Sequence, residues 1–259
     1  MRLGVMQPYF FPHTAHFALI AHTDRWVVFD TTQYTPKRWM NRNRVLNGNT
    51  GLKAGAKLND GESWSWLTVP VRHVHRSAPV SEVMTNDLAG AKRKILGQLA
   101  HYRRHAPFAS TVVDLVGDVM TTTGDEPLVD LDTRGLSAVC SYLGLPFNWA
   151  RLSKLDLSLP PVDHPGGWAP AISSATGADE YLNPIGGRHL FSTVEFCSTG
   201  VRLLFCDAQP MPYETGPYEP VPGLSIIDAL MWCSPQQIVD NLASARIVPA
   251  PNTEVTAVA

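Results

Sequence analysis

Near the N-terminus, short apolar segments are separated by polar residues, and the apolar positions have strand spacing in some segments and helical spacing in another. Arg2 to Met6 is an apolar run of strand length, and Trp26 to Phe29 is a second one. Between them, the apolar positions after Thr14 have helical spacing, with Thr14 as the expected cap. Strand, helix and strand in this order form a βαβ unit, whose two strands are almost always parallel neighbours in one sheet.

The middle of the chain favours helices. Ile95 to Tyr102 places apolar side chains at helical spacing, and Val112 to Val119 forms a second apolar stripe after Pro107. Before them, Asn47 to Ser63 is predicted to be a mobile loop, and we expect the extended stretch Trp64 to Val71 to join the N-terminal sheet. The predicted fold class is α/β, with a mostly parallel sheet opened by an N-terminal βαβ unit and a helical middle region.

In the second half of the chain, helix and strand patterns alternate again. The expected elements are a helix over Leu136 to Leu143 closed by Gly144, a strand over Phe147 to Leu152, a short helix over Ile172 to Gly177, a strand over Val201 to Phe205, and helices over Ser225 to Met231 and Gln236 to Leu242. Pro160 to Pro170 holds four prolines and two glycines, so it is the candidate boundary or lid.

These patterns divide the chain into three parts. Residues 1–159 form an α/β core with the helical middle region, and residues 160–248 form the C-terminal part of the same domain or a small subdomain. Residues 249–259 are expected to be a frayed tail.

Composition narrows the class of protein. Apolar residues make up 44% of the chain and charged residues 17%, which are globular values, and the net charge of -2 argues against a nucleic-acid partner. The apolar run before Gln7 is too short for a signal peptide, and no run of about 18 apolar residues could span a membrane. We therefore expect a cytoplasmic protein that acts on small molecules, with no membrane partner.

The four cysteines lie in the second half of the chain without a Cys-x-x-Cys pair, so neither a zinc site nor a disulfide framework is indicated. We expect no metal and no cofactor. The interruption at Ser234-Pro235 makes Cys233 the thiol expected to be most accessible, and it is the candidate nucleophile for a covalent acyl-enzyme. Cys140, Cys197 and Cys206 lie in apolar surroundings. The competing interpretation is that Cys233 is buried and inert as well.

Polar side chains follow both N-terminal strands, at the edge where parallel α/β sheets bind ligands. Gln7 leaves the first strand, and its amide could donate to a developing oxyanion or simply hold the loop. A wider polar group could grip an oxygen-rich substrate, and it consists of Asp30, Gln33, Asn41, Arg42 and Asn43. In the competing interpretation, Asp30 caps a turn and the residues from Asn41 onward hold a loop through side-chain-to-backbone hydrogen bonds.

Two further patterns carry candidate chemistry. His13 and His16 lie three residues apart at a helix start, where a neutral imidazole could deprotonate an amine, or where both could be structural. They also resemble the His-x-x-His of nucleotidylyltransferases, which binds nucleotide phosphates. A flexible anion-binding loop, or a plain turn, is predicted at Gly186, Gly187, Arg188 and His189.

Several of these segments together resemble the signature of the WbqC-like protein family. The matching segments are Gln7-Pro8-Tyr9-Phe10-Phe11-Pro12, Phe29-Asp30 with Gln33-Tyr34, Asn41-Arg42-Asn43-Arg44, Trp66-Leu67-Thr68-Val69-Pro70-Val71, Tyr102-Arg103-Arg104 to Pro107-Phe108, Gly177-Ala178-Asp179-Glu180-Tyr181-Leu182, and Leu224-Ser225-Ile226-Ile227-Asp228-Ala229-Leu230. Their order and spacing match over almost the whole chain. The chain departs from the family pattern at His13-Thr14-Ala15-His16, where an aromatic-x-Gly-Tyr run is usual.

The family is associated with O-antigen and natural-product gene clusters, and its members are suggested to transfer glycyl or other aminoacyl groups. The resemblance therefore implies an amide-forming acyltransferase or aminoacyltransferase. Such an enzyme would join an acyl group, carried as a thioester on an acyl or peptidyl carrier protein, to an amine of a sugar or small molecule.

In this hypothesis each candidate residue has a role. The assignments are Asp30 or His16 for the amine proton, Gln7 and Asn43 for the carbonyl, and Arg42 with Arg188 for the anionic part of a substrate. Two alternatives stay open: a nucleotidylyltransferase with a His-x-x-His phosphate site, and a non-catalytic ligand-binding protein.

Overall fold

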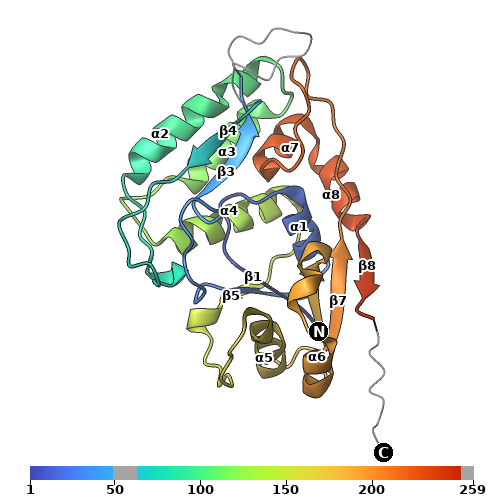
Figure 1. The fold of residues 1–259 in the computed structure, drawn as a ribbon. Helices are drawn as coiled ribbons and strands as arrows, with labels where there is room; N and C mark the ends of the chain where they lie inside the picture. The colour runs from blue at the N-terminus through green and yellow to red at the C-terminus, as the bar shows by residue number, and fades with distance from the viewer. Residues whose placement is uncertain (49–62, 252–259) are drawn as a thin grey trace, which may run out of the picture.

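The computed structural model describes residues 1–48 and 63–251, and its centre is a six-stranded sheet of order β5-β2-β1-β6-β7-β8 (Figure 1). The strands are β1 (Arg2–Met6), β2 (Arg25–Val28), β5 (Trp149–Arg151), β6 (Glu180–Pro184), β7 (Arg202–Asp207) and β8 (Arg246–Pro249). The first five strands in the sheet order are parallel, and β8 is an antiparallel edge strand. The predicted α/β class with a mostly parallel sheet is confirmed.

The N-terminal βαβ unit forms as expected. Strand β1 leads into helix α1 (Thr14–Ala21) and returns as β2, which pairs in parallel with β1 from Leu3↔Arg25 to Met6↔Val28. The chain then continues outward to β5, and later comes back to place β6 on the other side of β1. The connections therefore reverse direction between β1 and β6, and in such sheets a ligand crevice lies beyond the strand ends at this point.

Helices cover both faces of the sheet (Figure 1). The elements that share the larger core are α1, α2 (Leu88–Leu99), α3 (Ala109–Val119), α4 (Leu128–Leu143), α7 (Ile226–Trp232) and α8 (Pro235–Ala243). Helices α5 (Trp168–Ala175) and α6 (Thr193–Thr199) share a second core with the opposite side chains of β1, β2, β6 and β7. This alternation along the strands is what a sheet buried on both faces requires. Among the described residues, no helix is long and apolar enough to cross a membrane.

A separate hairpin packs beside the helical region. It consists of β3 (Arg42–Leu46) and β4 (Trp64–Thr68), which pair antiparallel from Arg42↔Thr68 to Leu46↔Trp64. The prediction that the Trp64 stretch joins the main sheet is therefore wrong. The sequence did not predict its partner strand β3, because Arg42-Asn43-Arg44 is not a typical strand sequence.

The predicted helices are present, but some of them begin at other residues than expected. Helices α2 and α3 are separated near Pro107, joined by the short 3-10 helix η2 (Ala100–Arg104), and α4 ends at Gly144, whose φ of 68° suits a glycine cap. Helix α5 begins at Trp168, earlier than expected, because Pro170 lies in its first turn, where proline is tolerated. The remaining 3-10 helices are η1 (Val80–Glu82), η3 (Leu152–Lys154), η4 (Pro165–Gly167) and η5 (Ile185–Leu190).

Two sequence predictions fall partly outside the described residues. Of the loop predicted over Asn47 to Ser63, residues 49–62 lie outside them, and of the predicted tail, residues 252–259 do. At the start of that tail, Pro249 is still the last residue of β8, and the Ala250 N–H donates to the Leu203 carbonyl at 3.0 Å.

Close packing of β1 against β2 gives the first testable prediction. A Cβ added to Gly4 would lie 2.6 Å from a ring carbon of Trp26, a side chain that is 1% exposed and cannot move aside. We expect Gly4→Ala to lower the free energy of unfolding by about 1–3 kcal/mol, as overpacking does. The matched control is Gly97→Ala in α2, where nothing lies within 4 Å of the added Cβ and a gain of about 0.5–1 kcal/mol is expected. Urea unfolding of both variants measures the difference, and equal effects would contradict the packing argument.

Candidate functional site

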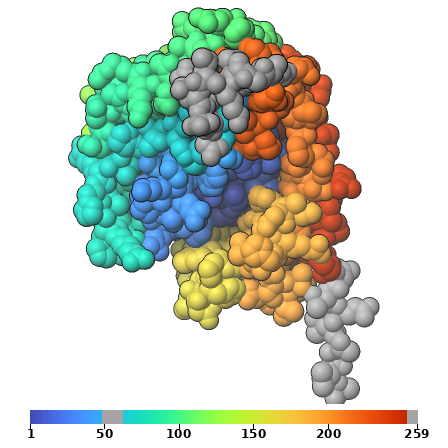
Figure 2. All heavy atoms as spheres, turned by 45° about the horizontal axis from the view of Figure 1, so that its top comes forward, coloured from blue at the N-terminus to red at the C-terminus, as the bar shows by residue number. Residues whose placement is uncertain are grey.

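The loops that follow β1 and β6 leave the sheet side by side. Gly4 pairs with Leu182 in the register, so Gln7 emerges beside η5, which carries the predicted Gly186 to His189 loop. Figure 2 shows a hollow on the molecule, with a floor in the dark blue of the N-terminal segment and walls in lighter blue, gold and orange. The hollow lies where strand-end reasoning places a crevice, and its use by a ligand stays a prediction.

Gln7 holds the two N-terminal loops together. Its Nε2 donates to the Thr32 hydroxyl at 3.2 Å, and its Oε1 accepts from the Tyr9 hydroxyl at 3.2 Å. The end of β1 and the segment after β2 are thus joined, as the sequence predicted for this edge. Both ends of the Gln7 amide are engaged, so a role in polarising a carbonyl would require one of these bonds to open.

Asp30 lies deeper than a catalytic base would be expected to lie. Its side chain is 0% exposed, and its two carboxylate oxygens accept from the Ser153 backbone N–H at 2.9 Å and the Ser153 hydroxyl at 2.5 Å. In this arrangement Asp30 fixes the start of η3 against the end of β2. The contact is structural, but it joins two segments far apart in the sequence and is not the turn cap that the competing interpretation expected.

Asn43 is a structural hub of the family signature. Its Nδ2 donates to the Phe10 and Phe11 carbonyls at 3.2 and 2.8 Å, and its Oδ1 accepts from the Arg44 N–H at 2.8 Å. Phe11 has a φ of 42°, unusual for a residue with a side chain, and the Ser225 hydroxyl also donates to its carbonyl at 2.7 Å. Three signature segments far apart in the sequence thus converge to fix the loop that leads into α1.

The remaining members of the polar group have separate positions. The Asn41 Nδ2 donates to the Val69 carbonyl at 2.9 Å, and the exposed Gln33 donates to the Arg76 carbonyl at 2.7 Å. The Arg42 side chain lies over the Trp66 ring at 3.8 Å. These side chains therefore do not form one joint grip on a substrate.

The predicted anion-binding loop is the 3-10 helix η5. A Cβ on Gly187 would lie 2.4 Å from the Asn183 amide nitrogen, so the glycine allows a close approach to β6. Arg188 is exposed and lies 5.8 Å from the Phe205 ring centroid, and Gly186 and His189 are exposed as well. The loop is open to a ligand on the gold side of the hollow in Figure 2.

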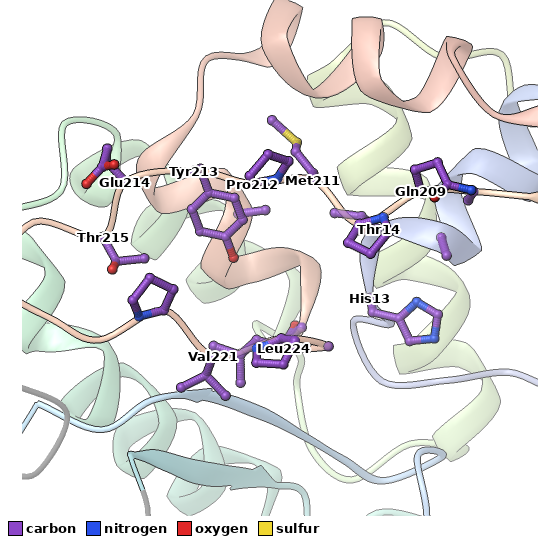
Figure 3. Close-up of a pocket in the computed structure, with 18 residues that line it drawn as sticks. His13, Thr14, Gln209, Met211, Pro212, Tyr213, Glu214, Thr215, Val221 and Leu224 are labelled. Carbon is purple, nitrogen blue, oxygen red and sulfur yellow. The ribbon is translucent and has the colours of Figure 1, made fainter.

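A pocket of about 950 Å³ lies between the start of α1 and two proline-containing segments that precede α7 (Figure 3). Its lining residues are His13, Thr14 and Ala15 of α1 with its cap, Ala208, Gln209, Pro210, Met211, Pro212, Tyr213, Glu214 and Thr215 after β7, and Pro220, Val221, Pro222, Gly223, Leu224, Ser225 and Ala229 before and in α7. The walls are mostly apolar, and the polar side chains that line them include His13, Tyr213 and Glu214. This volume is at the upper end of the range for small-molecule sites, about 300–1,000 Å³.

The two histidines have different surroundings. His13 is the N-cap of α1, and its side chain is exposed at the pocket. Partial burial, together with the Arg44 charge, lowers the pKa of His13, so its imidazole is neutral at pH 7. His16 is 3% exposed, with its ring 5.1 Å from the Trp26 ring, and burial lowers its pKa to about 3. Only His13 is available to a ligand in the pocket.

A buried carboxylate supports the opposite wall. The Tyr213 hydroxyl donates to Asp228 at 2.6 Å, and the Tyr102 hydroxyl donates to the other carboxylate oxygen. Burial raises the pKa of Asp228 to about 6, and the two tyrosine hydrogen bonds oppose that shift. The network fixes the Tyr213 ring, which Figure 3 shows at the pocket, to α7.

The order of cysteine accessibility differs from the sequence prediction. Cys233 is 3% exposed, and burial raises its pKa to about 11, whereas Cys197 is exposed. The expectation that Cys233 is the accessible thiol is therefore wrong, because its position after α7 returns the chain into the core. Cys197 lies in the short amphipathic α6 and faces outward.

This arrangement predicts a simple labelling result. A thiol reagent at pH 8 is expected to modify Cys197 rapidly in the folded protein, and the other cysteines only after unfolding. Peptide mass spectrometry before and after denaturation measures this, with Cys197→Ser as the control. Rapid labelling of Cys233 in the folded state would contradict the buried position.

Most of the pocket was not anticipated from the sequence. Its walls come from residues 208–215 and 220–225, which carry no charged motif. One signal was present: Pro210 and Pro212, then Pro220 and Pro222, stand two residues apart, and such spacing favours extended backbone without strand pairing.

The fold defines a class: an α/β protein with a mostly parallel six-stranded sheet covered by helices on both faces, whose connections reverse direction between β1 and β6. Residues 7–240 match the model of the WbqC-like protein family, so the chain belongs to that family. It is also similar to the uncharacterized protein Rv1507c of Mycobacterium tuberculosis (strain ATCC 25618 / H37Rv), with 29% identity over 145 residues. That alignment covers 56% of this chain and 57% of the relative, so it spans little more than half of either protein. No solved structure matches the chain.

Proposed function

We propose that the protein is an acyl or aminoacyl transferase that forms an amide from a carrier-bound thioester and an amine of a sugar or other small molecule. The observation that carries the proposal is the pocket of about 950 Å³, which has proline-containing apolar walls and ends at the neutral His13. A pantetheine thioester is a long, narrow chain in which amide groups alternate with short apolar stretches, and the pocket has room for it beside a small acceptor.

The start of α1 suits the reacting carbonyl. His13, Thr14 and Ala15 line one end of the pocket, and the first N–H groups of a helix have no partner within the helix. These dipoles are favourable to the negative charge that develops on a carbonyl oxygen during acyl transfer. Asn43 and Ser225 donate to the Phe11 carbonyl, so the loop that leads into the first turn of α1 is held in place.

The proposed reaction is a direct transfer. The amine nitrogen attacks the thioester carbonyl, and a C–N bond forms. The His13 imidazole accepts the proton from the nitrogen and passes it to the departing thiolate as the C–S bond breaks. The products are an amide and a free carrier thiol, so no oxidant, metal or covalent acyl-enzyme is needed.

The test is a transfer assay with purified protein. Aminoacyl-carrier thioesters, glycyl first, are incubated with amino sugars, and mass spectrometry looks for a new amide together with free carrier thiol. A donor presented as free pantetheine thioester separates a requirement for the carrier from a requirement for the thioester. Absence of an amide with every donor would overturn the proposal.

Neither alternative function is favoured by a specific observation. A His-x-x-His phosphate site would need both imidazoles at the ligand, and His16 lies on the buried face of α1 against Trp26 and Tyr9. A non-catalytic ligand-binding protein would bind a thioester without releasing its thiol, so the same assay separates it from a transferase.

A further inference from the structure

The outward face of the β3–β4 hairpin carries an unusual set of side chains. Arg42 and Arg44 alternate on β3, and Trp64 and Trp66 alternate on β4, with Arg44 paired to Trp66 in the register. Trp39 precedes β3 and joins them. Because side chains two residues apart on a strand share a face, these residues form one surface, named the arginine–tryptophan ladder below.

The rings and guanidinium groups of the ladder alternate in space. Arg42 lies 3.8 Å from the Trp66 ring centroid, and Arg44 lies 5.0 Å from that of Trp64 and 5.5 Å from that of Trp39. The indoles also contact each other, with Trp39 5.6 Å and Trp64 5.3 Å from Trp66. All of these side chains are partly exposed to solvent.

Among residues 1–48 and 63–251, neither arginine of the ladder has a carboxylate as an ion-pair partner. Their hydrogen bonds go to backbone carbonyls, from Arg42 to Lys37 and from Arg44 to Gly223 at 3.2 Å. Two like charges two residues apart on one face of a strand repel each other, and an anion bound beside both would relieve that repulsion.

The ladder adjoins the pocket. Gly223 is a pocket residue, and the Arg44 carbonyl accepts from the Ser225 N–H at 2.8 Å. The Arg44 charge also acts on His13. A ligand held by the ladder would therefore lie beside the imidazole that faces the pocket.

We infer that the arginine–tryptophan ladder is a binding site for a ligand that carries a phosphate group next to a ring, such as a nucleotide or a sugar phosphate. Guanidinium groups bind phosphate through paired hydrogen bonds, and exposed indole faces stack on bases and other flat ring faces. That the ladder binds such a ligand does not depend on the proposed function. That this ligand is the amine-bearing acceptor of the transfer rests on the proposed function.

The test measures binding without any transfer reaction. Uridine diphosphate and glucose 1-phosphate are the two probes, uridine and glucose are their uncharged counterparts, and calorimetry and intrinsic tryptophan fluorescence are the readouts. We expect at least one phosphate probe to bind and to change the fluorescence, since three of the seven tryptophans lie in the ladder. Its uncharged counterpart is expected to bind at least about 10-fold more weakly.

Matched variants locate the site. Arg42→Gln and Arg44→Gln are each expected to raise Kd by about 10-fold or more, whereas Arg93→Gln, on an exposed position of α2, makes the same charge change and leaves Kd within about 2-fold. Binding of only the nucleotide or only the sugar phosphate identifies the source of the ligand and supports the inference. If neither probe binds, or if the ladder variants bind like wild type while their unfolding midpoints fall, the ladder is a structural stack and the inference is overturned.

Discussion

A His13→Ala variant is expected to lose about 100- to 10,000-fold in kcat for amide formation while remaining folded, because it lacks the group that accepts the amine proton. His13 is exposed at the pocket and is the N-cap of α1 without a side-chain hydrogen bond to the helix, so its removal costs little stability. Single-turnover kinetics with a saturating carrier thioester measures the step directly. A loss confined to KM would instead make His13 a binding residue.

The pH dependence sharpens this prediction. Because burial and the Arg44 charge lower the pKa of His13 below its usual 6.5, the neutral base persists below that pH, and the acidic limb of the kcat/KM profile should lie below 6.5. The His13→Ala variant should lack that limb. His73→Ala removes an exposed histidine elsewhere and is the matched control. A variant with the wild-type rate and profile would contradict a role for His13 as the base.

The sequence predicted the fold correctly in segments where the apolar residues recur at a single spacing, either that of a helix or that of a strand. The βαβ unit, the helices around Pro107 and the Gly144 cap all depend on local spacing, which determines which face is buried. The pairing of β3 with β4 could not be predicted, because the positions of Arg42 and Arg44 on a strand are explained only by Trp64 and Trp66 on the paired strand. Strand preference depends on the neighbouring strand, and the sequence does not reveal that neighbour.

The sequence predicted only some of the contacts at the candidate site. Gln7 and the residues after β2 do meet, as strand-end reasoning predicted, and His13 was recognised as one of a pair. The roles of Asp30 and Asn43 could not be assigned, because a buried carboxylate or amide looks the same in sequence whether it meets a backbone group or a substrate. In this structure, Asn43 holds the loop that leads to α1 at the pocket, and Asp30 holds η3 against the end of β2.

The second large effect concerns His16 and the stability of the protein in acid. Burial, with a smaller contribution from His13, lowers the pKa of His16 to about 3, while in the unfolded chain it is near 6.5. Between these values the unfolded state binds more protons, so stability is complete above about pH 6.5 and is lost as the pH falls toward 3. At pH 4.5 the expected loss from this residue is on the order of 3 kcal/mol relative to pH 7.

The variant that isolates this effect is His16→Phe, which keeps a ring against Trp26 and removes a buried Nε2 without a hydrogen-bond partner among the described residues. We expect its free energy of unfolding to equal or exceed that of wild type at pH 7 and to exceed it by several kcal/mol at pH 4.5. Asp228 acts in the opposite direction, since its raised pKa removes stability as the pH rises toward 6, but it is common to both proteins and cancels in the difference.

Urea unfolding of wild type, His16→Phe and the exposed His73→Phe at the two pH values measures the effect, and a constant difference between wild type and His16→Phe would contradict it. The same variant also decides how His16 takes part in the reaction. If His16→Phe is stable and still forms the amide, the residue serves as packing beneath α1. If it is stable and inactive, the proton acceptor is His16, and the pocket must open along α1 during turnover.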